Sequence, residues 1–169
     1  HRRQRQMCIR DSNNTEHAAN LFGLKEFGNI YSRLGNPTVG ALEARLTALE
    51  DGAMCVALSS GTSAVMYSLI NIMSQGDNFV TANQLYGGTY TMFDNILPEY
   101  GINSKKVDIT DFEAVESAID EKTRAIYCET ITNPGLVVAD ISALADIAHS
   151  KGIPLIAVSY THLRAHETR

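Results

Sequence analysis

The chain has 169 residues, of which 44% are hydrophobic and 20% are charged. This composition is typical of a globular domain with a sizeable core and excludes disordered and fibrous classes. No apolar run approaches the roughly 20 residues that a membrane-spanning helix needs, and no apolar segment follows the basic N-terminus, so we expect neither membrane insertion nor secretion. The three cysteines, Cys8, Cys55 and Cys128, are widely spaced, which favours reduced core thiols and a cytoplasmic location.

The two ends of the chain differ in charge from its middle. Residues 1–12 and 159–169 hold six of the fourteen basic residues and two of the nineteen acidic ones, which leaves eight basic and seventeen acidic residues in 13–158. The resulting net charge of −9 disfavours nucleic acid as a partner. Both ends lack periodicity and resemble translated sequencing-adapter sequence, so we expect 1–12 and 159–169 to be artefactual tails.

The middle of the chain predicts an arm followed by one partial domain. Residues 13–35 are polar and lack a strong period, which favours an extended arm. From Asn36, a suitable N-cap, apolar residues recur at helical spacing as far as Leu49. After this helix, strands are predicted at 53–58, 79–82, 103–107, 125–128 and 153–158, and further helices at 64–73, 89–100, 111–119 and 141–149. This alternation predicts an α/β fold in three layers, with helices on both faces of a mostly parallel sheet formed by residues 36–158.

Ser60, Gly61 and Thr62 form a turn between a predicted strand and a predicted helix. In open α/β sheets, ligands bind beyond the carboxyl ends of the strands, where helix N-termini offer free N–H groups and a positive dipole to an anion. Gly61 would let the backbone approach a phosphate, and Ser60 or Thr62 would add a hydroxyl donor. The same turn could equally serve as a helix cap alone.

Two further segments are candidates for contact with a planar, phosphorylated ligand. Tyr86 precedes Gly87-Gly88 at the next strand-to-helix turn, where its ring could stack on a cofactor or simply lie half-buried at a helix start. Tyr31 and Arg33 are two residues apart in the arm. Their side chains would point the same way if the arm is extended, and they could clamp a phosphate or form an ordinary surface segment.

An acid and an amide follow the predicted strand that ends at Cys128. Glu129 comes directly after this strand, and Asn133 precedes Pro134-Gly135, a pair that forces a turn. Asn133 could donate a hydrogen bond to a phenolic oxygen or a substrate carboxylate, or it could bond only its own backbone. Both residues are expected at the same edge of the sheet as Tyr86.

Other kinds of active site receive little support. His17 and His149 have no Cys, Asp or Glu at ligand spacing, so we expect no metal site. The segment Ser59-Ser60-Gly61 lacks the Gly-x-Ser-x-Gly elbow of a serine hydrolase. No Gly-x-Gly-x-x-Gly opens a helix, which argues against a dinucleotide-binding dehydrogenase.

Six short motifs occur in a fixed order between residues 27 and 158. They are Tyr31-Ser32-Arg33, Gly35-Asn36-Pro37-Thr38, Leu49-Glu50, Ser59-Ser60-Gly61, Tyr86-Gly87-Gly88-Thr89, and Glu129 with Asn133-Pro134-Gly135. Each motif is weak alone, but the ordered set resembles the Cys/Met-metabolism family of pyridoxal-phosphate enzymes. Residues 86–90 and 129–136 look most like the O-acetylhomoserine sulfhydrylase branch of that family.

The resemblance implies a fold-type-I transferase-like domain that binds pyridoxal 5'-phosphate. Gly61 and Thr62 would hold the cofactor phosphate beside Ser60, and Tyr86 would stack on the pyridine ring. The resemblance further implies that Asn133 lies near the phenolic oxygen and Glu129 near the ring. Members of the family commonly have Met where Thr62 stands, a change that a backbone contact tolerates.

The family also implies a partner subunit and a reaction. Tyr31 and Arg33 would bind the cofactor phosphate of a neighbouring subunit in a homotetramer built as a dimer of dimers. Sulfide would replace the acetate of O-acetylhomoserine and give homocysteine, a step of methionine biosynthesis. Relatives that make or split cystathionine, or that release methanethiol from methionine, use the same machinery and remain alternatives.

Two residues that the family requires are not found where they are expected. The aspartate that pairs with the pyridinium nitrogen should follow the last predicted strand, where Val158 and Ser159 stand. No lysine of the chain lies in the Ser-x-Thr-Lys setting of the Schiff-base lysine. We therefore expect an N-terminal fragment of such an enzyme, inactive by itself, with a non-catalytic oligomeric binding domain as the alternative from another class.

Overall fold

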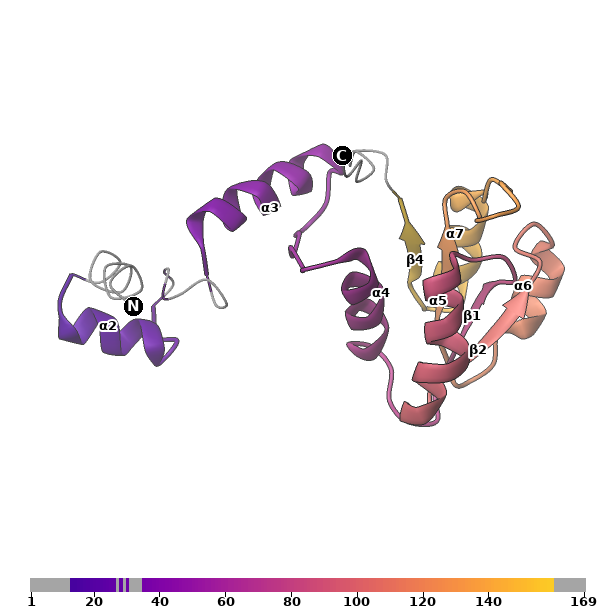
Figure 1. The fold of residues 1–169 in the computed structure, drawn as a ribbon, viewed down its shortest axis with the longest axis horizontal. Helices are drawn as coiled ribbons and strands as arrows, with labels where there is room; N and C mark the ends of the chain where they lie inside the picture. Colours follow the sequence, from indigo (N-terminus) through magenta and orange to yellow (C-terminus); the bar gives the residue numbers. More distant parts are fainter. Residues whose placement is uncertain (1–12, 27, 29, 31–34, 160–169) are drawn as a thin grey trace. The chain divides into compact units, whose positions relative to one another are not determined.

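The computed structural model describes residues 13–26, 28, 30 and 35–159. The described residues form two compact units, one ending at Ala57 and the other beginning at Leu58, and both are drawn in Figure 1. The predicted domain 36–158 has residues in both units, so its existence as one domain stays a prediction. Within the described ranges, no helix is long and apolar enough to cross a bilayer.

The described part of the first unit contains two helices, α2 (Thr15–Phe22) and α3 (Pro37–Leu49). Helix α3 confirms the predicted cap, because the side chain of Asn36 accepts hydrogen bonds from the N–H groups of Thr38 and Val39 at 2.9 and 3.4 Å. Helix α2 corrects the expectation of an extended arm over these eight residues. The Asn14 side chain caps it by accepting from the N–H of His17 at 2.8 Å, and the apolar residues Ala18, Leu21 and Phe22 have the three- and four-residue spacing of a helix face.

The predicted strand 53–58 is not formed in the structure. A strand exists only where a second backbone offers donors and acceptors in register. The N–H of Ala57 instead donates to the Glu43 carboxylate at 2.8 Å, and the apolar side chains of Met54 and Val56 are exposed. The apolar run is typical of a strand, but no second strand is hydrogen-bonded to it in the described part of the chain.

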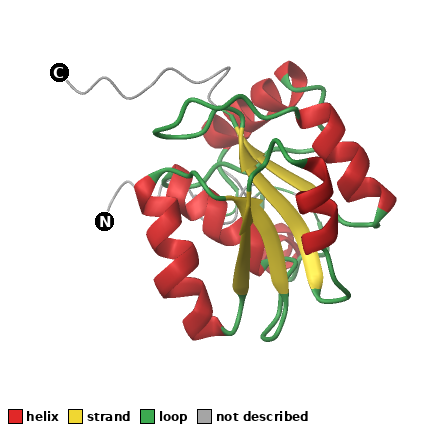
Figure 2. Cartoon of the chain, turned by 90° about the vertical axis from the view of Figure 1, so that its right-hand side faces the viewer, coloured by secondary structure: helices red, strands yellow, loops and turns green. Residues whose placement is uncertain are grey.

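The second unit is built on a four-stranded parallel sheet, whose strands are yellow in Figure 2. Its strands are β1 (Asn78–Ala82), β2 (Asn103–Val107), β3 (Thr123–Glu129) and β4 (Leu155–Val158). They are hydrogen-bonded in the order β2-β1-β3-β4, and every neighbouring pair is parallel. The predicted α/β fold with a parallel sheet is confirmed.

Helical segments connect these strands. They are α4 (Gly61–Ile70), α5 (Gly87–Thr91), the π-helical turn η1 (Met92–Ile96), the 3-10 turn η2 (Leu97–Tyr100), α6 (Phe112–Ala118) and α7 (Ile141–Ser150). The predicted helix over 89–100 is helical throughout, but it changes from α-helical to π-helical at Met92 and to 3-10 at Leu97. Gly101 ends the segment in the left-handed region at φ 73°.

The core lies on both faces of the sheet. On one face, the ring of Phe93 from η1 makes edge-to-face contacts with Phe79 and Tyr127, with ring centroids 4.7 and 4.9 Å apart. Helix α7 contributes fully buried Leu144 and Ala148 to the same core cluster. Right-handed crossovers between parallel strands place α6 and α7 on the face opposite to α5 and η1.

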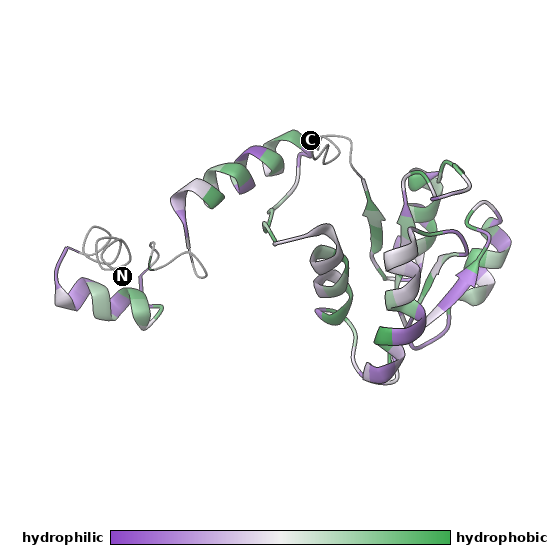
Figure 3. Cartoon of the chain, in the orientation of Figure 1, coloured by the Kyte–Doolittle hydropathy of each residue, from purple (hydrophilic) through white to green (hydrophobic). Residues whose placement is uncertain are grey.

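Strand β4 lies at the edge of the described sheet, beside β3. All five residues of β1 are buried, whereas Ala157 of β4 is exposed and its other residues are half-buried. Figure 3 shows that β4 is nevertheless hydrophobic along its length. Apolar side chains on both faces are typical of a strand in the interior of a parallel sheet.

Candidate functional site

The topology of the sheet points to the carboxyl ends of β1 and β3. These two strands are neighbours, but β1 leads to β2 on one side and β3 leads to β4 on the other. In open α/β sheets, ligands bind at the carboxyl edge where successive connections diverge in this way. Tyr86 follows β1, and Glu129 and Asn133 end or follow β3, so these three predicted site residues belong to the loops at this switch point.

The structure links these loops through the carboxylate of Glu129. One carboxylate oxygen, Oε1, accepts a hydrogen bond from the backbone N–H of Tyr86 at 2.9 Å, and the backbone N–H of Asn133 acts on the same carboxyl by lowering its pKa. Glu129 is only 6% exposed. The sequence predicts the three residues at one edge, but the hydrogen bond between Tyr86 and Glu129 joins positions 43 residues apart and leaves no local pattern.

Burial perturbs the two titratable groups at the end of β3. Desolvation raises the pKa of the Glu129 carboxyl, and the hydrogen bonds from Tyr86 and Asn133 act in the opposite direction. Desolvation, with the nearby charge of Glu129, raises the pKa of the Cys128 thiol to about 11. Cys128 is therefore a protonated core thiol, as predicted, and not a nucleophile.

The ring of Tyr86 lies over the first turn of α5. It is 56% exposed, and a Cβ atom added to Gly88 would stand 2.7 Å from its Cε1 atom. A Cβ added to Gly87 would meet nothing within 4 Å. Gly88 thus permits the close approach of the ring to the backbone, while the ring keeps an exposed surface for contact with a ligand.

The N-terminus of α4 offers free backbone donors. The Ser60 hydroxyl accepts from the N–H of Ser63 at 3.1 Å and caps the helix. The N–H groups of Gly61 and Thr62 have no hydrogen-bond partner in the described part of the chain. Because α4 leads into the amino end of β1 and contacts α5, its own N-terminus faces the carboxyl edge of the sheet.

Tyr31 and Arg33 lie outside the described residues, so their predicted contact with a phosphate stays a prediction. His17 has local partners, because its Nδ1 accepts from the N–H of Asn13 and its Nε2 lies 3.5 Å from a Glu26 oxygen. His149 is in the last turn of α7. Within the described ranges, no three His, Cys, Asp or Glu residues are grouped as metal ligands are.

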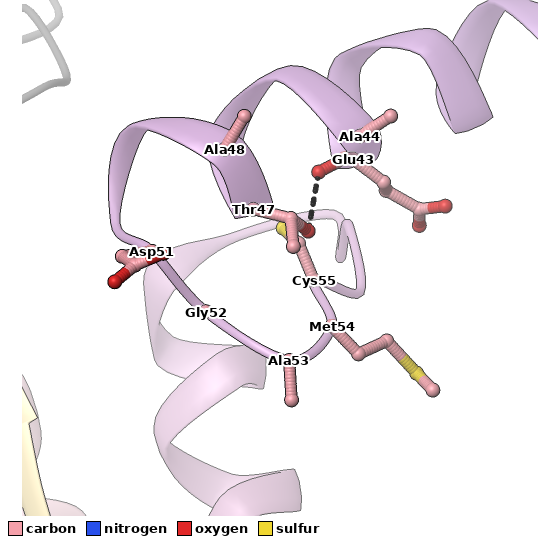
Figure 4. Close-up of a pocket in the computed structure, with 9 residues that line it drawn as sticks. All are labelled: Glu43, Ala44, Thr47, Ala48, Asp51, Gly52, Ala53, Met54 and Cys55. Carbon is pink, nitrogen blue, oxygen red and sulfur yellow. Dashed lines mark hydrogen bonds between the residues drawn. The ribbon is translucent and has the colours of Figure 1, made fainter.

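The first unit contains an open hollow of about 460 Å³ beside the C-terminal half of α3 (Figure 4). None of the predicted site residues lines it. Its lining is mostly small side chains with two acids, Glu43 and Asp51, and Glu43 is already bonded to the N–H of Ala57. Cys55, expected in the core, is only partly buried in this wall. The carboxyl edge of the sheet, with its free donors and exposed ring, is therefore the stronger candidate site.

Comparison with known proteins agrees with the motifs and the fold. The sequence profile of the Cys/Met metabolism PLP-dependent enzymes matches residues 6–162. The sulfhydrylase FUB7 of Fusarium oxysporum f. sp. lycopersici is 49% identical over 144 residues, which are 85% of this chain and 33% of that protein. The O-acetyl-L-homoserine sulfhydrylase of Leptospira meyeri is 48% identical over 142 residues, which are 84% of this chain and 32% of that protein. This chain thus spans about a third of the length of these relatives.

A solved structure gives the same assignment. A protein of Campylobacter jejuni, assigned as an O-acetylhomoserine (thiol)-lyase, superposes with a TM-score of 0.82 at 41% identity, over 87% of this chain and 36% of that chain. It contains N'-pyridoxyl-lysine-5'-monophosphate. The parallel sheet of the second unit is therefore part of a fold-type-I domain, and the chain belongs to the Cys/Met-metabolism family of pyridoxal-phosphate-dependent enzymes.

Proposed function

We propose that this chain is the phosphate- and ring-binding portion of an O-acetylhomoserine sulfhydrylase, which makes homocysteine from O-acetylhomoserine and sulfide by γ-replacement. The observation that carries the proposal is the arrangement at the carboxyl edge, where free N–H groups of α4 and the exposed ring of Tyr86 belong to one compact unit. The sulfhydrylase names of the relatives support this substrate class.

The residues present fit pyridoxal phosphate. Two adjacent free N–H groups at the N-terminus of a ten-residue helix, with the helix dipole behind them, suit a phosphate dianion. Ser60 is occupied as the cap of α4, so we assign the direct backbone contacts to Gly61 and Thr62. The hydroxyl of Thr62 adds a donor beside them. The exposed Tyr86 ring suits a planar heterocycle.

Each residue has a separate task in this proposal. When bound, the cofactor supplies an electron sink for the amino-acid substrate. Gly61 and Thr62 anchor its phosphate, and Tyr86 covers one face of its ring and excludes water there. The side-chain amide of Asn133, which is exposed, donates to the phenolic oxygen or to the substrate carboxylate.

Other parts of the proposed active site come from elsewhere. Tyr31 and Arg33 bind the cofactor phosphate of a neighbouring subunit in a homo-oligomer. The chain has no Ser-x-Thr-Lys sequence, and Ser159 follows β4 in place of an aspartate. We infer that the Schiff-base lysine and the pyridinium aspartate belong to the part of the protein that this chain does not span, and that the chain alone is inactive.

A chimaeric enzyme tests this function. Residues 13–158 replace the matching region of the Leptospira meyeri sulfhydrylase, and the unmodified enzyme serves as the control. We expect the chimaera to bind pyridoxal phosphate and to release homocysteine from O-acetylhomoserine and sulfide. A folded, cofactor-loaded chimaera that prefers cystathionine or methionine would contradict the proposal in favour of a lyase. A folded oligomer that binds no cofactor would favour the non-catalytic binding domain.

A further inference from the structure

Glu129 is a buried acid without a cationic partner among the described residues. Its side chain is 6% exposed, and none of the ion pairs of the described residues includes it. Burial of an unpaired carboxylate is unfavourable unless hydrogen bonds satisfy it. The N–H of Tyr86 supplies such a bond, so the buried acid at the end of β3 is tied to the loop that follows β1.

The hydrogen bond to Glu129 holds the start of α5. Tyr86 is the N-cap of α5, but no side chain caps this helix. The backbone N–H of Tyr86 is fixed to the end of β3 instead, 2.9 Å from Glu129 Oε1. Because the Tyr86 ring also packs on Gly88, a displacement of the Tyr86 backbone would move the ring with it.

We propose that Glu129 is a positioning residue: by accepting a hydrogen bond from the backbone of Tyr86, it sets the separation of the loops after β1 and β3, between which the cofactor ring binds. Glu129 thereby acts through its neighbours and does not itself need to touch the reacting atoms. This role rests on the proposed function for its purpose, but its geometric basis can be tested without enzymatic activity.

Three substitutions of Glu129 distinguish the effect of its hydrogen-bond acceptor from the effects of its charge and of its side-chain volume. Glu129→Met keeps the size of the side chain and removes the acceptor. Glu129→Asp keeps the charge and withdraws the acceptor by one methylene. Glu129→Gln keeps an acceptor oxygen at the original reach and removes the charge. Asp111→Ala is the matched control, because Asp111 accepts from the backbone N–H of Ala114 at 3.0 Å in a different loop.

The first measurement is amide hydrogen exchange of the 169-residue chain, followed by NMR. We expect the amide of Tyr86 to exchange at least about tenfold faster in Glu129→Met and Glu129→Asp, since a tenfold change corresponds to about 1.4 kcal/mol of local stability. In Glu129→Gln and Asp111→Ala the same amide should stay within about twofold of the wild type, after correction for global stability. Unchanged protection in both Met and Asp variants would overturn the proposal, as would equal loss in the Gln variant.

The second measurement is the affinity of the chimaeric holoenzyme for pyridoxal phosphate. We expect weakening by about tenfold in Glu129→Asp and Glu129→Met, and rescue to within about threefold in Glu129→Gln. If the chimaera makes no homocysteine but the exchange pattern holds, the proposed function fails and the positioning role stands. If homocysteine is made and the chimaera and its three Glu129 variants bind pyridoxal phosphate with equal affinity, the positioning role fails and the proposed function stands.

Discussion

At the scale of single residues, the carboxyl of Glu129 links stability to pH. Its pKa in the folded chain is raised above the ordinary value of 4.5, chiefly by burial. A raised folded-state pKa means that the stability associated with this group is fully present below the unfolded pKa and is lost as the pH rises through the folded pKa. Ionisation of Glu129 therefore destabilises the folded chain at neutral pH.

The variant Glu129→Gln should remove this loss, because the amide does not ionise. We expect it to unfold at a higher urea concentration than the wild type at about pH 8, and the difference in free energy of unfolding to shrink towards zero at about pH 4. Urea titrations at several pH values measure it. A difference that is independent of pH would show that Glu129 keeps an ordinary pKa.

The buried hydroxyl of Thr81 lowers the stability of the fold for a different reason. It is fully buried in β1, and its hydroxyl has no hydrogen-bond partner within the described residues. Thr81→Val replaces this hydroxyl by a methyl group of similar size, so we expect the free energy of unfolding to rise by about 1 kcal/mol. Chemical denaturation provides the measurement. A decrease would indicate that the hydroxyl is bonded, for example to a buried water.

At the scale of elements, α5 depends on its two glycines in different ways. Gly88→Ala places a Cβ 2.7 Å from the Tyr86 ring, whereas Gly87→Ala meets nothing within 4 Å. Aromatic stacking is worth about 0.5–1.5 kcal/mol, which corresponds to roughly a two- to tenfold change in affinity. We expect a loss of this size for pyridoxine 5'-phosphate in Gly88→Ala and none in Gly87→Ala, measured by titration. Equal effects of the two substitutions would contradict the assigned role of the ring.

The sequence was sufficient for elements with a clear period or cap. Strand β2 begins and ends where predicted, at Asn103 and Val107, and the predicted Asp111 cap precedes α6. The predicted strand at 53–58 is not formed because pairing requires two backbones, and a short apolar run describes only one of them. Helix α2 is an exception: its Asn14 cap and the spacing of Ala18, Leu21 and Phe22 indicate a helix, but its two turns lie in an otherwise polar segment without a period.

The location of the candidate site could also be predicted from the sequence, but its hydrogen bonds could not. Tyr86, Glu129 and Asn133 were placed at one edge because parallel strands bring their carboxyl ends together. The use of Ser60 as a cap was left open, and the structure shows that its hydroxyl accepts from Ser63. The hydrogen bond from the Tyr86 backbone to Glu129 depends on the conformations of the loops that follow β1 and β3. Residue types alone do not specify these conformations.

At the scale of the whole molecule, the central claim is that the carboxyl edge of the sheet binds the cofactor phosphate and ring. The second unit contains the free N–H groups of α4 and the Tyr86 ring. A ligand that lacks the cofactor aldehyde isolates this reversible recognition from covalent reactions with lysines. Pyridoxine 5'-phosphate is such a ligand.

The most direct test is an NMR titration of the 169-residue chain with pyridoxine 5'-phosphate, with inorganic phosphate as the control. We predict that the amide signals of Gly61 and Thr62 shift with both ligands, because both carry the anion. The signals of Tyr86 and Gly88 should shift only with pyridoxine 5'-phosphate, because only that ligand carries the ring. Shifts confined to the capped N-termini of α6 and α7, or no saturable shift at Gly61 and Thr62, would contradict the assignment of this edge as the cofactor site.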